Sequence, residues 1–310
     1  MNFLITGGAG FLGAALSNRL HRQGHHVRVL DDLSTGDPDA LDPDVHFTRG
    51  DINDRPKLWT LLQDIDVVYH LAARVSVPES ILFPSDYNDV NVGGTATLME
   101  AARDAGTPRV VLASSGAVYG DQQGPMLTED MAPKPLSPYA VSKLSSEWYV
   151  RTIGDLSGIE TICLRIFNAY GPGQRIPAAH PPIIPNFIRQ CLQNGTLVFH
   201  GDGNQTRDYV FVDDVVNAMV SASTVEGLDE PVINIGSGME TSGRDLARIM
   251  IEITDGNPEE VYNPRIGGGV SRMCADLSLA KEKLDYVPLI PLDKGLQLTM
   301  DKDPQFKNGG

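Results

Sequence analysis

Short apolar runs alternate with amphipathic stretches along the first half of the chain. Apolar residues at helical spacing, such as Val90, Leu98, Met99 and Ala102 within 86–105, predict helices. The apolar runs are bounded by polar turns and predict strands at 1–6, 26–30, 46–49, 66–70 and 109–113. Strand alternating with helix is typical of an α/β fold with a doubly wound parallel sheet.

Beyond Gly171 this alternation breaks. Several prolines mark an irregular stretch, and the later pattern predicts short strands at 197–200, 209–212 and 232–235 and helices near 186–193, 242–254 and 278–284. The strand at 232–235 is expected to return to the main sheet. We therefore expect a nucleotide-binding domain at 1–170, with 209–240 partly returning to it, and a smaller α/β substrate-binding lobe from 171–208 and 241–310.

The turn between the first strand and the first helix reads Gly7-Gly-Ala-Gly-Phe-Leu-Gly13. Gly7 permits a tight turn, Gly10 lets a pyrophosphate approach the backbone, and Gly13 lets the helix pack closely on the strand. The helix N-terminus then offers N–H groups and a positive dipole end to phosphates. Because the strand, the turn and the helix occur together, the pattern predicts a dinucleotide-binding site of the Rossmann type.

Acidic and small residues follow the next strands. Asp31 ends the second strand, where a carboxylate accepts hydrogen bonds from both adenosine ribose hydroxyls and repels a 2′-phosphate, so NAD is favoured over NADP. Asp51 follows the third strand and is positioned for the adenine amino group or for the N-cap of a helix near 54–63. The small residues of Leu71-Ala-Ala73 leave space for a flat ligand.

Tyr139 and Lys143 lie four residues apart in a predicted helix and share one face. A phenol with a pKa of about 10 is a poor base at neutral pH. A nearby ammonium favours the phenolate. Ser115, at the end of the fifth strand, is the candidate to hydrogen-bond the same substrate oxygen. Tyr119 is a rival base, but Gln123 and not a lysine follows it at the same spacing.

Composition narrows the class of ligand and compartment. The net charge of −15 and the pI near 4.8 argue against nucleic acid and anionic membranes as partners. Cys163, Cys191 and Cys274 have no metal-like spacing and indicate buried thiols in a reducing compartment. The first strand begins too early for a signal peptide, and no apolar run is long enough to span a membrane. We expect a cytoplasmic protein with no metal site.

Taken in order, the motifs resemble those of the extended short-chain dehydrogenase/reductases, in the nucleotide-sugar epimerase and dehydratase group. They are the glycine turn, Asp31-Asp-Leu-Ser-Thr-Gly36, Asp89-Val-Asn-Val-Gly-Gly-Thr95, Tyr139-x-x-x-Lys143, Arg165-Ile-Phe-Asn-Ala-Tyr-Gly-Pro172 and Arg207-Asp-Tyr-Val-Phe-Val-Asp213. The resemblance implies bound NAD, a tyrosine base, a lysine on the nicotinamide ribose and a nucleoside diphosphate sugar in the cleft. The cofactor-binding candidates are Gly7, Gly10, Phe11, Leu12, Asp31, Asp32, Ser34, Thr35, Gly36, Asp51, Ile52, Leu71, Ala72, Ala73, Asn91, Tyr139 and Lys143.

The residues after Ser115 distinguish reactions within this group. The dehydratases carry carboxylates there that serve as acid and base for loss of water, whereas this chain has Gly116 and Ala117. The segment is similar to that of the 4-epimerases, which need only transient oxidation at C4. Tyr139 would take the proton of the sugar 4-OH, with Ser115 and Lys143 assisting, and the ketose would rotate before reduction on its other face.

The resemblance places the substrate contacts in the second lobe. The candidates are Asn168 and Arg207 on the phosphates, Arg265 near the nucleotide, His200 against the base, Met273 beside the sugar C2 substituent and Arg175. Arg175 is placed to pair with a C6 carboxylate or to be solvated, and Gly267-Gly-Gly269 replaces the usual acidic partner of Arg265. UDP-glucose and UDP-galactose are the first choice, and UDP-N-acetylhexosamine and UDP-glucuronate remain open.

Two alternative functions stay open. One is a net NAD-dependent oxidoreductase, dehydratase or synthase acting on a nucleotide sugar. A remote one is a non-catalytic NAD-binding protein, which typically lacks the Tyr or the Lys. The resemblance also implies a homodimer formed through helices at 86–105 and 139–157, where Trp148 and Tyr149 either cover the interface or pack internally.

Overall fold

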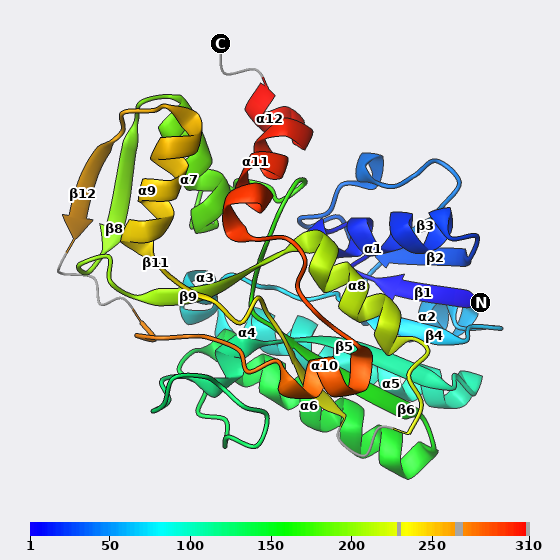
Figure 1. The fold of residues 1–310 in the computed structure, drawn as a ribbon. Helices are drawn as coiled ribbons and strands as arrows, with labels where there is room; N and C mark the ends of the chain where they lie inside the picture. Colours follow the sequence, from blue (N-terminus) through cyan, green and yellow to red (C-terminus); the bar gives the residue numbers. More distant parts are fainter. Residues whose placement is uncertain (228–230, 264–268, 308–310) are drawn as a thin grey trace.

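A seven-stranded sheet carries the first part of the chain (Figure 1). The computed structural model describes residues 1–227, 231–263 and 269–307. All neighbouring strands of this sheet are parallel, in the order β10-β6-β5-β4-β1-β2-β3. The strands are β1 (Asn2–Thr6), β2 (His26–Asp31), β3 (His46–Arg49), β4 (Val67–His70), β5 (Arg109–Ser115), β6 (Glu160–Ile166) and β10 (Val232–Ile235). The strand order reverses between β1 and β4, where ligands of such sheets bind.

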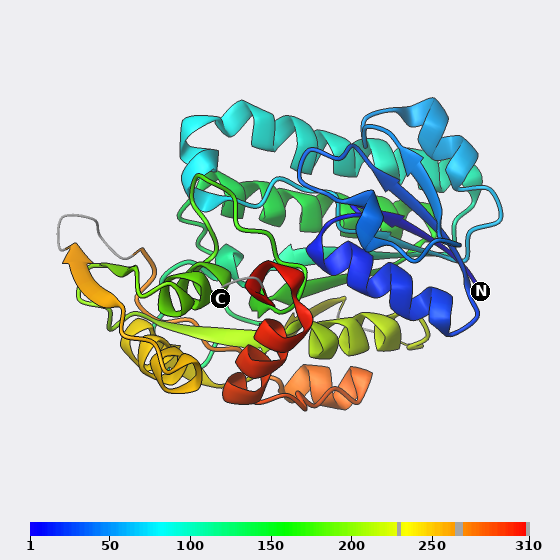
Figure 2. The same cartoon turned by 90° about the horizontal axis from the view of Figure 1, so that it is seen from above.

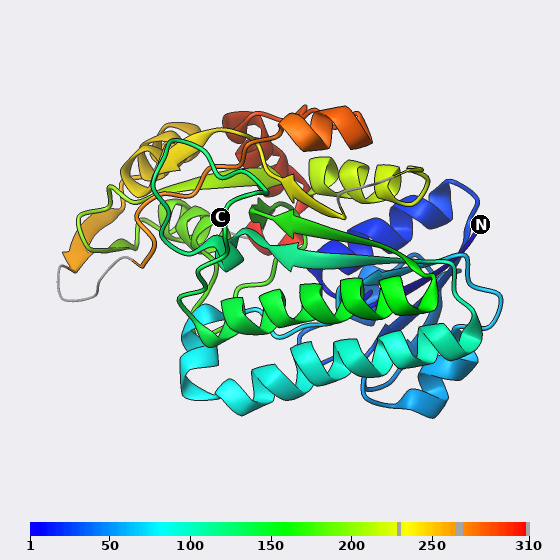
Figure 3. The same cartoon turned by 90° about the horizontal axis from the view of Figure 1, so that it is seen from below.

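Helices cover both faces of this sheet, as a doubly wound fold requires. One face packs against α2 (Arg55–Leu61), α5 (Gly94–Ala105) and α6 (Pro138–Ser157), and the other against α1 (Phe11–Arg22) and α8 (Val212–Ala222). Along β1, Leu4 faces the first group while Phe3 and Ile5 face the second, so the strand is apolar on both sides. Figure 3 shows α5 and α6 side by side beneath the sheet.

The predicted helix at 86–105 is interrupted. It consists of α4 (Pro84–Tyr87), a π-helical turn at Asn88–Gly93 and then α5. A π turn of this kind widens the helix locally and is frequent at functional sites. It places the Asn91 side chain in the interior, next to α6.

The second lobe is built on two small sheets. They are β11 (Glu240–Ser242)-β9 (Thr206–Phe211)-β7 (Asn168–Tyr170) and β12 (Glu259–Asn263)-β8 (Thr196–His200). The helices of this part are α7 (Ile183–Leu192), α9 (Gly243–Thr254), α10 (Ser278–Leu284), α11 (Leu292–Lys302) and α12 (Pro304–Lys307). Seen from above, α7, α9 and the β8-β12 pair extend beyond one end of the main sheet (Figure 2).

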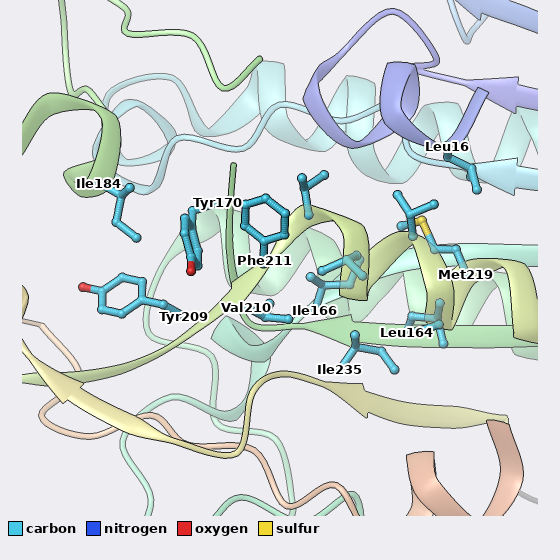
Figure 4. Packing of buried hydrophobic residues seen from close by; sticks show 14 of the residues in the cluster. Leu16, Leu164, Ile166, Tyr170, Ile184, Tyr209, Val210, Phe211, Met219 and Ile235 are labelled. Carbon is cyan, nitrogen blue, oxygen red and sulfur yellow. The ribbon is translucent and has the colours of Figure 1, made fainter. Parts of the chain in front are cut away.

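One hydrophobic cluster joins the two parts. Figure 4 shows Leu164 and Ile166 of the main sheet in the same packed group as Ile184 of α7 and Phe211 of β9. The chain returns to the main sheet through α8, which packs on α1, and through β10, which pairs with β6. The lobe is therefore fixed to the sheet by a continuous core.

The structure differs from the prediction in several elements of the second half. The strand predicted at 209–212 starts at Thr206 and ends at Phe211, and Val212 begins α8, which was not predicted. The prediction also omitted β6, β7, β11, β12, α11 and α12. The strand at 232–235 and its return to the main sheet are confirmed. No helix within the described ranges is long and apolar enough to cross a membrane.

Candidate active site

The glycine turn has the close contacts that its sequence predicts. Gly7 has φ +69°, and a Cβ there would lie 2.6 Å from the backbone nitrogen of Ala72, so the turn abuts the end of β4. A Cβ on Gly13 would lie 2.1 Å from the carbonyl oxygen of Gly7. A Cβ on Gly10 would meet only that same oxygen, at 3.2 Å. The Gly10 backbone is thus open on its outer side, which fits a pyrophosphate held against it.

Helix α1 begins directly after this turn without a side-chain cap. Gly10 is the N-cap, and the first turn carries no acidic residue. The leading N–H groups are therefore available to an anion, and the dipole end is not neutralised by a carboxylate. Phe11 and Leu12, at the start of the helix, are half-buried. These features fit the phosphates of NAD.

Asp31 ties the end of β2 to the glycine turn. Its Oδ2 accepts from the Ala9 N–H at 3.0 Å, and its Oδ1 accepts from the Leu33 N–H at 2.9 Å. Burial raises the pKa of Asp31, while these two hydrogen bonds act in the opposite direction. The loop that follows is held by the Ser34 N–H, which donates to Asp32 Oδ1 at 2.8 Å. Thr35 is exposed on this loop, and Gly36 packs beside the Asp31 carboxylate.

Asp51 does not cap the helix that follows it. The N-cap of α2 is Asp54, whose side chain accepts from the Lys57 N–H at 3.1 Å. Asp51 instead accepts from the Asn53 N–H at 2.8 Å in a tight turn, and Ile52 is buried beside it. The N-cap alternative is therefore wrong, and contact with the adenine stays a prediction.

Asn91 holds the loop after β4. Its Oδ1 accepts from the Arg74 N–H at 2.8 Å, and its Nδ2 donates to the Arg74 carbonyl at 3.0 Å and to Ser142 Oγ at 2.9 Å. The preceding residues Leu71, Ala72 and Ala73 are half-buried at the carboxyl end of β4. The Asn91 amide thereby fixes this loop to α6.

Helix α6 presents Tyr139 and Lys143 from a well-defined start. Ser137 is its N-cap and accepts from the Ala140 N–H at 3.1 Å, and Pro138 occupies the first helical position. The Ser115 side chain lies close enough to the Tyr139 hydroxyl to influence its pKa, so the structure brings the predicted serine and tyrosine together. Burial raises the pKa of Tyr139, and Ser115 acts in the opposite direction. Burial lowers the pKa of Lys143 to about 8.

The predicted substrate residues fall into two groups. Asn168 and Arg207 lie on the small sheet, on paired strands β7 and β9, and Asn168 Nδ2 donates to the Asp208 carbonyl at 3.2 Å. Met273 is buried against Tyr119 and Phe167. Arg207 and Met273 lie in the lobe that the prediction assigned to the substrate, whereas Asn168 lies just before its predicted start at residue 171. The contacts of all three with a ligand stay predictions.

The other substrate candidates lie nearer the surface. His200 is exposed at the end of β8, and Arg175 pairs with Asp37, with Nη2 2.6 Å from Oδ2. The guanidinium of Arg175 is therefore paired with a carboxylate of the chain itself, and its contact with a substrate carboxylate stays a prediction. Arg265 lies outside the described residues.

Sequence reasoning missed two buried polar residues beside this site. His70, in the fourth strand, contacts Thr6 Oγ1 through Nδ1 at 2.8 Å and Thr95 Oγ1 through Nε2 at 2.9 Å. Burial lowers the pKa of His70 to about 3, so the ring is neutral. Glu147 lies one helical turn after Lys143 and is almost fully buried. Its spacing from Lys143 was a signal that could have found it.

The chain combines a doubly wound parallel sheet with a glycine turn, an acid at the end of β2 and a Ser–Tyr–Lys group. This combination defines a class of enzymes, the NAD-dependent short-chain dehydrogenase/reductases. Residues 3–236 match the model of the NAD dependent epimerase/dehydratase family. The chain belongs to this family.

Relatives of known activity are similar over nearly the whole chain. The UDP-glucose 4-epimerase of Mycolicibacterium smegmatis is 38% identical over 309 residues, which cover 97% of this chain and 98% of that protein. The structure of the Thermotoga maritima UDP-glucose 4-epimerase with UDP-glucose is 35% identical, with a TM-score of 0.92 and coverage of 96% and 97%. The UDP-glucuronic acid 4-epimerase of Bacillus cereus, in complex with UDP-glucuronic acid and NAD, is 33% identical, with a TM-score of 0.88 and coverage of 97% and 98%.

Proposed function

We propose that this enzyme interconverts UDP-glucose and UDP-galactose by epimerisation at C4. The observation that carries the proposal is the segment after Ser115, where Gly116 and Ala117 offer no carboxylate beside the Ser115–Tyr139 pair. Loss of water from a sugar needs an additional acid and base, whereas inversion at C4 needs one group that moves a single proton off and back onto the 4-oxygen. The similarity to UDP-glucose 4-epimerases from several bacteria supports the same substrate.

The chain's own residues then have separate tasks. Tyr139 accepts the proton of the sugar 4-OH and returns it after the 4-ketose has rotated in the site. Ser115 hydrogen-bonds the same oxygen. By its positive charge, Lys143 favours the phenolate of Tyr139. Burial of Tyr139 acts in the opposite direction. NAD, when bound, supplies the acceptor and then the donor of the C4 hydride. Residues of the glycine turn and Asp31 would hold its pyrophosphate and adenosine ribose.

The substrate is tested with a panel of UDP-, dTDP- and GDP-sugars, with the product stereochemistry determined by NMR. We expect UDP-glucose and UDP-galactose to interconvert, and UDP-N-acetylglucosamine and UDP-glucuronate to react with a kcat/KM lower by about tenfold or more. Bound NAD should stay oxidised over many turnovers. Stoichiometric accumulation of NADH would instead identify a net oxidoreductase.

Preference for UDP-glucuronate would contradict the proposed sugar and would point to Arg175. In this structure Asp37 already occupies that guanidinium, so a C6 carboxylate would have to displace an ion pair. An Arg175→Met variant is the matched comparison. With UDP-glucose as substrate it should keep kcat/KM within about threefold, because the ion pair that it removes is exposed and screened by solvent.

A homodimer is the quaternary state we propose. Val141, Trp148 and Tyr149 lie at helical spacing on α6 and are 51%, 57% and 45% exposed, so the two aromatic residues do not pack internally. An apolar stripe on the outer face of α6 is suited to pack against a second copy of the same helix.

We expect Trp148→Glu to convert the dimer to a monomer in sedimentation velocity, because the new charge would be buried in the interface. Trp59→Glu is the matched control, since Trp59 is 49% exposed on α2 and lies outside the stripe. If the unmodified chain sediments only as a monomer, the homodimer is wrong.

A further inference from the structure

A buried ion pair lies directly behind the active-site helix. Glu147 of α6 and Arg165 of β6 are 1% and 4% exposed as side chains. Arg165 Nη2 donates to Glu147 Oε2 at 2.8 Å, and Arg165 Nε donates to Oε1 at 3.0 Å. The Ser114 hydroxyl donates to the same Oε1. The carboxylate is therefore fixed by three donors in a site away from solvent.

This carboxylate contacts or adjoins each element that carries the active site. Tyr139, Lys143 and Glu147 follow one another at intervals of four residues, so they lie along one face of α6. Ser114 immediately precedes Ser115 at the end of β5. Glu147 is therefore linked to Lys143 by the shared helix, and to Ser115 by its hydrogen bond with the preceding residue of β5.

Such a pair is expensive to bury. Desolvation of two charges often exceeds their attraction, and an apolar pair of similar volume is frequently at least as stable. The acid–base chemistry proposed above uses neither Glu147 nor Arg165. The pair therefore calls for a role beyond stability.

We propose that Glu147 is a positioning residue whose negative charge, held in place by Arg165 and Ser114, keeps the Lys143 ammonium charged inside the protein. The inference rests on the proposed function, in which the charge of Lys143 favours the Tyr139 phenolate. Glu147 itself does not touch the substrate.

Among the described residues around Lys143, Glu147 is the main source of negative charge. From β4, His70 is neutral, and from β6, burial raises the pKa of the Cys163 thiol far above its usual range, so it is neutral too. On α6, burial likewise favours the neutral form of Tyr139. Burial lowers the pKa of Lys143 to about 8, and Glu147 acts against that effect. Lys143 therefore titrates close to neutral pH, where a small loss of stabilisation changes its charge.

The test is the pH profile of kcat for the enzyme with bound NAD, compared between wild type and Glu147→Gln. We expect the basic limb to move to lower pH by about one unit, the lower end of the effect of a nearby opposite charge. Glu147→Asp, which keeps the charge, should leave the limb near its wild-type position. Glu129→Gln is the control, because Glu129 is a partly buried carboxylate that accepts from the Asn234 N–H and is not among the charges that act on Lys143.

Thermal stability gives a readout that does not depend on the reaction. A lysine with a lowered pKa makes stability rise with pH between its folded and unfolded pKa values, because the unfolded chain binds more protons there. In wild type the pH range over which stability rises begins near pH 8. In Glu147→Gln this range should begin at lower pH. The Tm of the variant relative to that of wild type should therefore increase between pH 6.5 and 8.

A single neutralised carboxylate leaves Arg165 buried without its partner, which strongly destabilises a protein. The double variant Glu147→Gln/Arg165→Met removes both charges and should still move the basic limb and the pH dependence of Tm to lower pH. The role of Glu147 would be overturned if, in whichever variant folds, neither the basic limb of the kcat profile nor the pH dependence of Tm moved to lower pH. Absence of epimerase activity in wild type would refute the proposed function, and the Tm comparison would still decide the inference.

Discussion

Replacing Tyr139 by phenylalanine is expected to lower kcat with UDP-glucose at least roughly a hundredfold, the scale of a lost acid–base group. The substitution removes only the phenolic oxygen, so packing of the ring against Tyr87, at a centroid distance of 6.4 Å, is retained. The start of α6 should also be retained, because Ser137 rather than Tyr139 caps the helix. KM should change little, since the 4-OH loses one of two hydrogen-bonding partners while the phosphate contacts remain.

Tyr119→Phe separates this role from that of the rival tyrosine. The Tyr119 ring is fully buried under the Arg165 guanidinium, 4.7 Å from its carbon, and its hydroxyl donates to Asn234 Oδ1 at 2.7 Å. A hydroxyl engaged in this way is structural. Tyr119→Phe should lower stability by about 1 kcal/mol and keep kcat within a fewfold of wild type. Near-normal turnover in Tyr139→Phe would refute the assignment of Tyr139 as the base.

Much of the main sheet could be predicted because its strands are apolar on both faces and its helices carry apolar stripes. Helix α8 was missed although Val212, Val215, Val216 and Met219 follow helical spacing. The aromatic and β-branched residues at 209–212 predict a strand, and that strand includes Val212, the first residue of the helix. The signal was present, but two periodicities overlapped.

Two other elements carry a weak apolar signal. The buried face of α11 includes Gly295 and Thr299 beside Leu296, and a Cβ on Gly295 would lie 2.1 Å from the Tyr170 hydroxyl. Close packing onto a large neighbour selects a small residue there and interrupts the apolar stripe of Leu292, Leu296 and Met300. Strand β12 is mostly exposed and begins with two glutamates, so it too lacks the pattern on which strand prediction depends.

The candidate site shows the same division between local and non-local signals. The glycine turn and the Tyr139–Lys143 spacing depend on residues close in sequence, and local geometry was enough to predict them. The partners of Arg175 and Glu147 are distant in sequence, and only the folded chain brings Asp37 and Arg165 to them. Charge alone did not show that one glutamate is solvated while another is buried behind the catalytic helix.

Gly13→Ala is expected to destabilise the protein by about 3 kcal/mol or more, the upper end of the cost of overpacking, and to abolish retention of NAD. The added methyl group would lie 2.1 Å from the Gly7 carbonyl oxygen and 2.6 Å from the Gly8 Cα. Both are backbone atoms, and Gly7 is itself held against Ala72, so the turn cannot move without separating α1 from the sheet. Thermal unfolding and the NAD content of the purified protein measure the two effects.

Two matched alanine variants separate packing from cofactor contact. At Gly93 an added Cβ has 3.6 Å of space and φ is −59°, so Gly93→Ala should leave stability and NAD content unchanged. At Gly10 the methyl group would meet a single carbonyl oxygen at 3.2 Å, and it would point into the space assigned to the pyrophosphate. Gly10→Ala should therefore lose NAD with a much smaller loss of stability than Gly13→Ala. If Gly13→Ala retained NAD and a wild-type Tm, or if Gly10→Ala bound NAD normally, the turn would not hold the cofactor in the proposed way.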